Sequence, residues 1–353
     1  MLDQQVRIGA ETTLDARVAN VVRRVLADEA AHRPEAWPEA ARDLGAVLPR
    51  PGIGRTPQLW SVLAALGAAD LQLARAVEPH LDALAILAEA GAAGHDAMAV
   101  PGAAWGVFAA EGPGTRLSAV PAQGRWWLSG VKPWCSLADR LTHAVVTAWV
   151  DDERRGLFAV DLGSPAVRAD ADPDGWVARG LRDVVSLPVT MHDAPGCAVG
   201  PPGWYLQRDG FAWGGIGVAA IWYGGAVGLA RRLAAGTGRS RPRDQVSYLH
   251  LGEVDQRLTA ARAVLQGAAD AVDAGRAAGA AGALLALRTR AVVAASCEAV
   301  LAAADHDLGP GPLVAEPGHA ARVADLRVYL RQHHAERDLA ALGRLVEEQD
   351  VAQ

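Results

Sequence analysis

The pattern of hydrophobic and polar positions changes twice along the chain, which divides it into three stretches. In residues 1–97, apolar side chains recur at helical spacing, as in 16–31, where a stripe of valine and leucine lies opposite Arg and Asp. Two further Ala- and Leu-rich helices are expected at 59–76 and 81–93, with a break near Pro79. This stretch therefore predicts an N-terminal helical domain.

The helical period is absent from residues 98–203. Runs rich in Val, Trp and Thr alternate there with clusters of Gly, Pro and Asp, as expected for short strands joined by turns. Their spacing predicts a middle domain that is a small antiparallel β-barrel or sandwich. The expected strands are 105–110, 117–122, 125–128, 141–150, 156–161 and 184–192.

Residues 204–353 are helical again. Gly275 and Gly279 mark one turn, and the Gly-Pro-Gly-Pro sequence at 309–312 marks the next. Long helices with apolar faces predict a C-terminal four-helix bundle, and the whole chain is expected to be of the α+β class. The four helices are expected at 210–236, 243–275, 279–306 and 317–348.

One segment of this stretch has the length of a membrane span. Residues 211–230 are 20 positions without a charged side chain. Six of them are glycines, and Gly224 and Gly228 form a small-xxx-small pair that permits close contact between helices. Because no second such segment is present, we expect a buried helix of the bundle rather than a membrane helix.

The composition favours a folded protein with two or three packed subdomains. Of 353 residues, 51% are hydrophobic and 21% are charged. The net charge of −6 gives no reason to expect binding to nucleic acid or to an anionic membrane. The three cysteines, Cys135, Cys197 and Cys297, are too widely spaced for a disulfide framework or a Cys-x-x-Cys metal site. We therefore expect a cytoplasmic protein without a metal centre.

The only lysine in the chain, Lys132, lies in a segment that combines turn and strand signals. Residues 124–136 follow the spacing G-x-W-x-L-x-G-x-K-x-W-x-S, and the strand expected at 141–150 comes next. This segment resembles the middle β-domain of the acyl-CoA dehydrogenase family. The order of helical, β and four-helix domains is similar as well, although the N-terminal domain is short for the family.

The resemblance implies a flavin cofactor, FAD or alternatively FMN, between the β-domain and the C-terminal bundle. In the family, the equivalents of Trp134 and Ser136 lie against the flavin ring and close to its reactive N5 atom. An aromatic plane can stack on the ring, and a hydroxyl can hydrogen bond to it. The structural alternative is a core Trp with a surface Ser at the end of a strand.

The loop at 109–115 falls where the family has a Thr-Glu-Pro-Gly-Ala-Gly-like loop that contacts the flavin and the substrate thioester. In this chain Ala110 replaces the Thr and is followed by Glu111. A plain β-turn explains this segment equally well.

Side chains near residue 240 correspond to family residues that hold the flavin pyrophosphate of a neighbouring subunit. Gln245 matches the family's register at the start of a helix, whereas the family's Phe-Gly is missing, so several arginines are interchangeable candidates. A solvated charge is the alternative for each of them. Gly309 and Gly311 occupy the position of a glycine-rich loop near the adenine end. The arginine candidates are Arg239, Arg241 and Arg243.

The reaction implied by the resemblance requires a base that removes the α-proton of an acyl thioester while hydride leaves to the flavin. The family's Glu-Gly-Thr is missing, and the register places Gln332, His333 or His334 at the base position, with Glu336 one turn beyond. A His at this position is similar to the flavin-dependent monooxygenases of the same fold, and surface histidines on a helix are the alternative. We predict that any base comes from His333, His334 or Glu336.

The leading prediction is an FAD-dependent oxidoreductase that oxidises the α,β bond of an acyl thioester such as an acyl-CoA. A flavin-dependent monooxygenase of the same fold and a non-catalytic partner subunit are the alternatives. In the family, C-terminal bundles pair to complete the flavin sites, which implies a homodimer or homotetramer.

Overall fold

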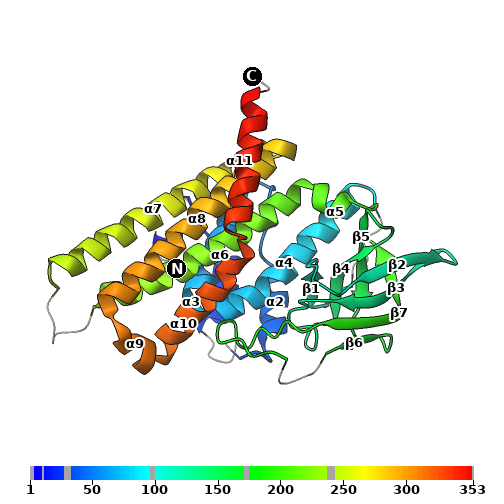
Figure 1. Ribbon diagram of the computed structural model, residues 1–353, viewed down its shortest axis with the longest axis horizontal. Coiled ribbons are helices and arrows are strands. Elements are labelled where there is room, and N and C mark those ends of the chain that lie inside the picture. The colour runs from blue at the N-terminus through cyan, green and yellow to red at the C-terminus, as the bar shows by residue number, and fades with distance from the viewer. Residues whose placement is uncertain are drawn as a thin grey trace.

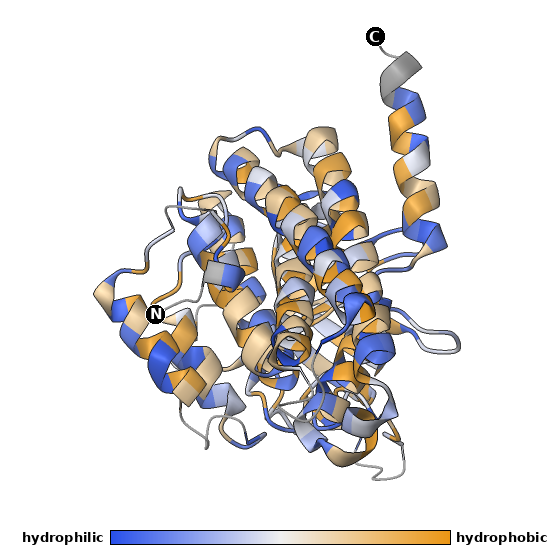
Figure 2. Ribbon diagram, turned by 90° about the vertical axis from the view of Figure 1, so that its left-hand side faces the viewer, coloured by the Kyte–Doolittle hydropathy of each residue, from blue (hydrophilic) through white to orange (hydrophobic). Residues whose placement is uncertain are grey.

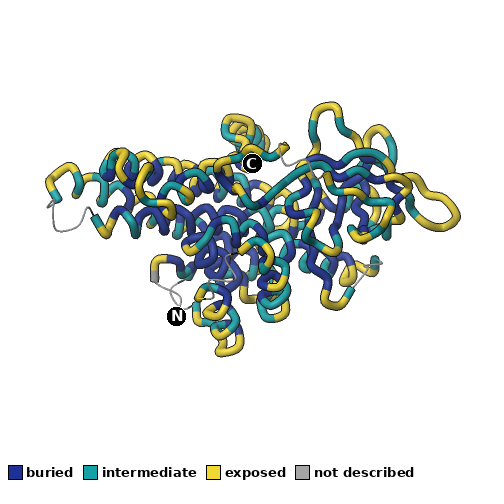
Figure 3. Tube along the Cα trace, turned by 90° about the horizontal axis from the view of Figure 1, so that it is seen from below, coloured by how far each residue is buried: buried dark blue, intermediate teal, exposed yellow. Residues whose placement is uncertain are grey.

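The computed structural model describes residues 4–9, 12–27, 33–95, 100–170, 175–236 and 243–351. A helical body and a β-domain lie side by side, and the helical body combines the first and last stretches of the sequence (Figure 1). Buried residues gather along the middle of the helical body and inside the β-domain (Figure 3).

The N-terminal helices differ from the prediction in where they break. The described elements are η1 (Gln4–Val6), α1 (Ala16–Ala27), α2 (Trp37–Gly45), α3 (Thr56–Ala69) and α4 (Leu71–Ala92). The predicted break near Pro79 is wrong: α3 and α4 meet at Asp70, whose carboxylate accepts hydrogen bonds from the backbone N–H of Gln72 and Leu73. Helix α4 continues through Pro79, because burial of its apolar side chains outweighs the roughly 3 kcal/mol that an internal proline costs.

The middle stretch forms a sheet of seven strands around its own core. They are β1 (Trp105–Phe108), β2 (Leu117–Ala122), β3 (Arg125–Lys132), β4 (His143–Trp149), β5 (Arg155–Asp161), β6 (Val167–Ala169) and β7 (Val189–Ala198). The strand order β1-β4-β2-β3-β7-β5, with an additional β4–β5 pairing, closes β4, β2, β3, β7 and β5 into a ring. Strands β1 and β6 pair with single members of that ring, β4 and β7.

The sheet corrects the predicted antiparallel arrangement. Both β1 and β2 pair with β4 in parallel, since the chain between them is long enough for a crossover connection. The strand predicted at 125–128 continues through Gly130, because a bulge between Leu128 and Gly130 shifts the register without ending the pairing. The strand predicted at 184–192 begins later, as β7, and β6 was not predicted.

Helix α6 is the central element of the helical body. The C-terminal helices are α5 (Trp204–Gln207), α6 (Asp209–Ala235), α7 (Gln245–Asp273), α8 (Gly279–Leu308), α9 (Pro310–Ala315), α10 (Pro317–Tyr329), η3 (Leu330–Gln332) and α11 (Glu336–Val351). Gly224 on α6 lies so close to α3 that an added Cβ would be 2.1 Å from the carbonyl oxygen of Ala64. In the described residues, α6 alone is long and apolar enough to cross a membrane, and 78% of its most apolar window is buried in the protein.

The last member of the predicted bundle is not one helix. The stretch 317–348 divides into α10, η3 and α11, because His333 is extended and Ala335 has a φ of 46°, neither of which continues a helix. Helix α11 stands away from the helical body, whereas α6, α7 and α8 run alongside one another as predicted (Figures 1 and 2).

Helix α4 joins the helical body to the β-domain. His80 on α4 is 3% exposed, and its Nδ1 accepts a hydrogen bond from the backbone N–H of Trp105, at the start of β1, over 3.1 Å. Burial, assisted by the charge of Arg42, lowers the pKa of His80 to about 4, so its ring is neutral and can accept this bond. The contact fixes α4 against the sheet.

Candidate active site

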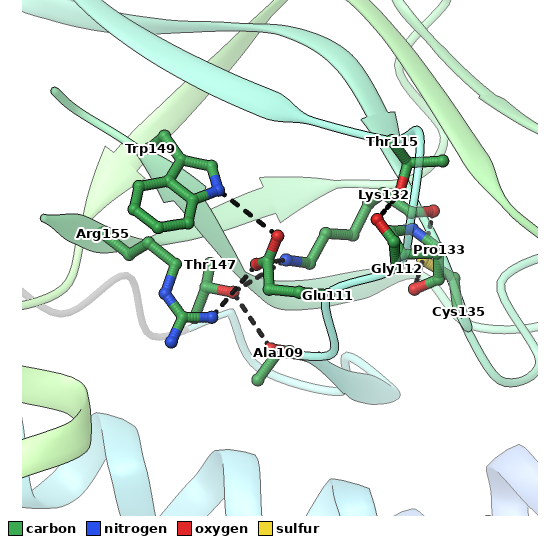
Figure 4. Close-up of polar contacts among 10 residues, drawn as sticks. All are labelled: Ala109, Glu111, Gly112, Thr115, Lys132, Pro133, Cys135, Thr147, Trp149 and Arg155. Carbon is green, nitrogen blue, oxygen red and sulfur yellow. Dashed lines mark hydrogen bonds and ion pairs between the residues drawn. The ribbon is translucent and has the colours of Figure 1, made fainter. Parts of the chain in front are cut away.

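An ion pair between a buried lysine, the only one of the chain, and a partly exposed carboxylate lies in the β-domain (Figure 4). Lys132, at the end of β3, is 1% exposed, and its Nζ donates to Glu111 Oε1 over 2.6 Å and to Thr147 Oγ1 over 2.9 Å. Arg155 and Trp149 donate to the same carboxylate over 3.1 and 3.3 Å. Three side chains thus hold Glu111.

These contacts fix the loop at 109–115 against the sheet. Burial by itself would raise the pKa of Glu111, but the hydrogen bonds from Lys132, Arg155 and Trp149 outweigh it and hold that pKa below its ordinary value. Ala110, the neighbouring predicted flavin contact, is exposed. The carboxylate of Glu111 is therefore bonded inside the β-domain, and its role in the structure is to anchor the loop.

The segment after β3 has a strained backbone. Trp134 and Leu137 have φ values of 60° and 58°, in the left-handed region that residues other than glycine rarely adopt. Trp134 is 57% exposed. Ser136, between them, has its Oγ 2.8 Å from the Oγ of Ser186, in the loop before β7, and accepts a hydrogen bond from Arg75 Nη2 of α4 over 3.1 Å. The strain is thus located at Trp134, which the sequence places beside a flavin, and at Leu137, the residue after Ser136.

Arg75 connects this segment to a carboxylate on α4. Its Nη1 lies 3.8 Å from Glu78 Oε2, and its guanidinium lies over the Tyr329 ring, 5.9 Å from the centroid. Within the described parts of the chain, Arg75 Nη1 and the buried Tyr329 Oη have no hydrogen-bond partner. The path from Ser136 through Arg75 to Glu78 therefore includes two polar groups, Arg75 Nη1 and Tyr329 Oη, that are free to hydrogen bond to a ligand.

Glu78 borders a cavity of about 730 Å³ between α4, α6, α8 and the C-terminal segment. A second cavity, of about 420 Å³, shares Glu78, Asp82 and Gly214 with the first. The wall of the larger cavity is mainly apolar, and its charged groups come from α4, from the start of α6 and from α8. Its larger apolar side chains include Leu206, Phe211, Val218 and Leu287.

Burial determines the protonation of Glu78. It raises the pKa of Glu78 to about 7, with a further increase from Asp82, although Arg75 and Arg290 act in the opposite direction. No described residue donates a hydrogen bond to this carboxylate. At neutral pH Glu78 therefore exists in both protonation states, which is the property that a general acid or base requires.

Asp82, one turn after Glu78, belongs to a buried ion-pair network. The Arg208 side chain is 1% exposed and donates to Glu89 over 2.8 Å and to Asp82 over 3.3 Å. Burial raises the pKa of Asp82 even though Arg208 opposes the change. The network fixes the start of α6 against α4.

Of the predicted base candidates, only His334 borders the cavity, and the three do not converge. His334 borders the cavity together with Gln332, and its side chain is 67% exposed with Nδ1 3.3 Å from Asp338. His333 is 9% exposed, and burial lowers its pKa. Glu336 is exposed in the first turn of α11 and does not border the cavity.

The predicted pyrophosphate contacts lie at the end of the helical body that is remote from the β-domain (Figures 1 and 3). Gln245 is the exposed first residue of α7, and Gly309 and Gly311 lie at and just after the end of α8 with open space around them. Arg239 and Arg241 lie outside the described residues. One copy of the chain therefore does not bring Gln245 or these glycines to Trp134. Arg243 donates to the backbone carbonyls of Leu233 and Ala234.

Glu78, Asp82 and Arg208 were not among the predicted site residues. A signal for the first two was present, because carboxylates four positions apart share one face of a helix that is otherwise rich in Ala and Leu. Arg208 has no comparable signal, since its partners precede it by 119 and 126 positions.

No family model matches this chain, and no curated protein matches it. Solved structures do. KijD3, in complex with FMN and dTDP-3-amino-2,3,6-trideoxy-4-keto-3-methyl-D-glucose, has a TM-score of 0.78 at 18% identity, over 98% of this chain and 96% of its own. Butyryl-CoA dehydrogenase from Megasphaera elsdenii has a TM-score of 0.78 at 15% identity, over 95% and 99%.

FMN-bound TdsC from Paenibacillus sp. A11-2 has a TM-score of 0.75 at 16% identity and covers 98% of both chains. Another structure of TdsC describes it as a dibenzothiophene monooxygenase, with a TM-score of 0.71 at 16% identity over 98% of both chains. The likenesses extend over nearly the whole chain and confirm the fold that the sequence resemblance predicted. At 15–18% identity they establish the fold alone.

Proposed function

We propose that this chain, which has the fold of the acyl-CoA dehydrogenases, is a flavin-dependent oxidoreductase that acts on a small molecule in the cavity beside Glu78. The path from Ser136 through Arg75 to Glu78 carries the proposal, with contacts of 3.1 and 3.8 Å. It joins the segment at the expected flavin position to a carboxylate that titrates near neutral pH.

The residues around Ser136 fit a flavin. Trp134 exposes 57% of its surface and offers an aromatic plane, and the buried Arg75 Nη1 and Tyr329 Oη lack partners within the described chain. FAD is the proposed cofactor and FMN the alternative, the latter supported by the FMN complexes of KijD3 and TdsC. The flavin would supply a two-electron acceptor at this position.

The side chains of the cavity have distinct proposed roles. Ser136, held by Arg75, positions a hydroxyl at the flavin, and Glu78 accepts or returns a proton of the substrate. The apolar wall excludes water and positions the substrate beside that carboxylate. In the dehydrogenase reaction, Glu78 would take the α-proton of an acyl thioester, which provides the carboxylate that the C-terminal segment lacks at the family position.

A flavin-dependent monooxygenase reaction is the second candidate, and the likeness to the dibenzothiophene monooxygenase TdsC supports it. Two assays separate the reactions. A dehydrogenase bleaches its flavin with an acyl-CoA under anaerobic conditions. A monooxygenase shows no such bleaching and consumes O2 when given externally reduced flavin. Inactivity in both assays would favour the third candidate, a non-catalytic subunit. We propose that the reaction, whichever of the two it is, takes place in the cytoplasm.

The purified protein is expected to bind flavin, and Trp134→Ala is expected to weaken that binding on the order of tenfold, because a stacked aromatic ring is lost. The visible spectrum of the protein and a flavin titration measure this. Trp127→Ala, which removes a Trp from the exposed β2–β3 hairpin, is the matched control. A colourless protein that takes up neither FAD nor FMN would contradict the proposed function.

A homodimer or homotetramer is expected in solution. Val246, Tyr248 and Leu249, beside Gln245 at the start of α7, are 60%, 63% and 62% exposed, an apolar surface that a second copy would cover. Sedimentation velocity at micromolar concentration measures the assembly. A protein that stays monomeric under these conditions would oppose both the assembly and the idea that Gln245 serves a neighbouring subunit's flavin.

A further inference from the structure

Two carboxylates on α4 lie where two cavities of the helical body meet. Glu78 and Asp82 are one turn apart and border both the 730 Å³ and the 420 Å³ cavity. Gly214 on α6 faces them, and a Cβ added there would lie 3.0 Å from Asp82 Oδ1. The absence of a side chain at Gly214 therefore keeps the space beside the carboxylates open.

Two guanidinium groups near this junction, those of Arg208 and Arg290, already donate to protein groups. Arg208 donates to Asp82 and Glu89 and is buried. Arg290 donates to the backbone carbonyls of Gly215 and Gln332 over 2.7 and 2.8 Å, and its guanidinium lies over an aromatic ring of α6. Both Arg208 and Arg290 thus direct donors at protein groups, which makes them poor binding groups for an anionic substrate.

Glu78 is in the opposite situation. Its nearest cation, Arg75, is 3.8 Å away and directs Nη2 at Ser136, and no described residue hydrogen bonds to the Glu78 carboxylate. Arg75 Nη1 and Tyr329 Oη also lack hydrogen-bond partners among the described residues, but the proposed function assigns them to the flavin, so the unused capacity left for the substrate is the Glu78 carboxylate, an acceptor. A ligand that matches it must present a donor next to an apolar body, because the walls around the carboxylates are mainly apolar.

We infer that the substrate of this site is an amine, whose ammonium group is held by Glu78 with Asp82 beside it and whose apolar body fills the adjoining cavities. The inference rests on the proposed function only in taking the larger cavity as the substrate site. A hydrogen bond between two charged groups is stronger than one from a neutral hydroxyl, so an amine is favoured over an alcohol of the same shape. A carboxylate of the same shape is repelled by Glu78 and Asp82.

The amine should bind more weakly as the pH falls through about 7, because burial raises the pKa of Glu78 to that value and only the ionised form attracts a cation. The groups that face Glu78 are Arg75 and Asp82 from α4, Arg290 from α8, and the phenols of Tyr205 and Tyr329. Burial keeps the pKa of both phenols above the ordinary value, so neither changes charge in this range.

Calorimetric titration of the purified full-length protein with 3-phenylpropylamine, 3-phenylpropanol and 3-phenylpropionate tests the inference, since the three probes share one hydrocarbon body. The amine is expected to bind about tenfold or more tightly than either of the others, as a charge-assisted hydrogen bond predicts. Glu78→Gln is expected to remove this preference. Glu347→Gln, which changes an exposed carboxylate on α11, is the matched control and should leave it unchanged.

Equal binding of the three probes, a preference for the propionate, no binding of any probe at millimolar concentration, or a preference that survives Glu78→Gln would each overturn the inference. Flavin uptake is measured separately from the visible spectrum. If the protein binds flavin but does not prefer the amine, this inference is wrong and the proposed function stands. If the protein prefers the amine but takes up no flavin, this inference stands and the proposed function is wrong.

Discussion

Replacing Glu78 by Gln is expected to lower turnover by about 100-fold or more, the usual contribution of a general base. The amide has nearly the same volume, so the cavity keeps its shape, but it cannot accept the proton. Flavin affinity should change little, because Trp134 and Ser136 lie on the β-domain side of Arg75. Turnover with saturating substrate and a flavin titration on the same preparation measure the two effects.

The pH profile provides a second test of the same residue. Burial raises the pKa of Glu78 to about 7, so a base at this position gives a rate that rises as the pH increases through about 7 and levels off above it. In Glu78→Gln that rise should disappear. His333→Ala and His334→Ala are the matched comparisons, since these residues were predicted from the sequence as the base. If either histidine variant abolishes turnover while Glu78→Gln retains it, the base is in the C-terminal segment.

Replacing Glu111 by Gln is expected to destabilise the β-domain by about 1–3 kcal/mol, because the buried Lys132 loses its charged partner while the Glu111 side chain itself is 31% exposed. Lys132 is 1% exposed, and the change would leave it with Thr147 as its remaining side-chain partner among the described residues. Burial already lowers the pKa of Lys132, opposed by the hydrogen bond that Lys132 donates to Glu111, so this pKa should fall further in the variant. Chemical denaturation followed by tryptophan fluorescence measures the loss.

The control for this variant is Glu153→Gln, an exposed position in the same domain, which should change stability by less than about 0.5 kcal/mol. The dependence of stability on pH in the acidic range gives an independent check of the direction of this effect. The pKa of Glu111 is held below its ordinary value. The ionised carboxylate therefore stabilises the folded state at a pH above the ordinary pKa, and this stabilisation is lost as the pH falls through the lowered pKa. The acid sensitivity of the variant should therefore be smaller. Equal stability of wild type and Glu111→Gln would show that Lys132 finds another partner or loses its proton at no cost.

The proposed amine site and the proposed base involve the same carboxylate, and they are compatible. An ammonium group must lose a proton before its nitrogen can donate electrons, and Glu78 is the neighbouring group able to take that proton. If the calorimetric and kinetic measurements both depend on Glu78, the acyl thioester becomes the weaker substrate candidate. If Glu78 affects turnover with an acyl-CoA and no amine binds, the dehydrogenase reading is favoured.

The sequence by itself determined the order of the three stretches, because helical and strand periodicities are local properties that follow from where apolar side chains repeat. It also identified the segment at 124–136, since the spacing of its Gly, Trp and Lys residues lies within one strand and the turn after it. Details that depend on local competition were less well predicted. The helix boundary lies at Asp70, whose side chain caps the start of α4, and not at Pro79. The strand predicted to end at Leu128 continues past Gly130 through a bulge.

Only the tertiary structure decided which residues form the site. Glu78 and Asp82 carry the chemistry because burial by α5, α6 and α8 changes their ionisation, and that burial comes from residues more than 100 positions away in the sequence. The contact of Arg75 with Ser136 spans 61 positions, and that of Lys132 with Glu111 spans 21. Neither pairing leaves a periodic trace in the sequence, because a contact between two side chains depends on how whole elements pack and not on the spacing within either one.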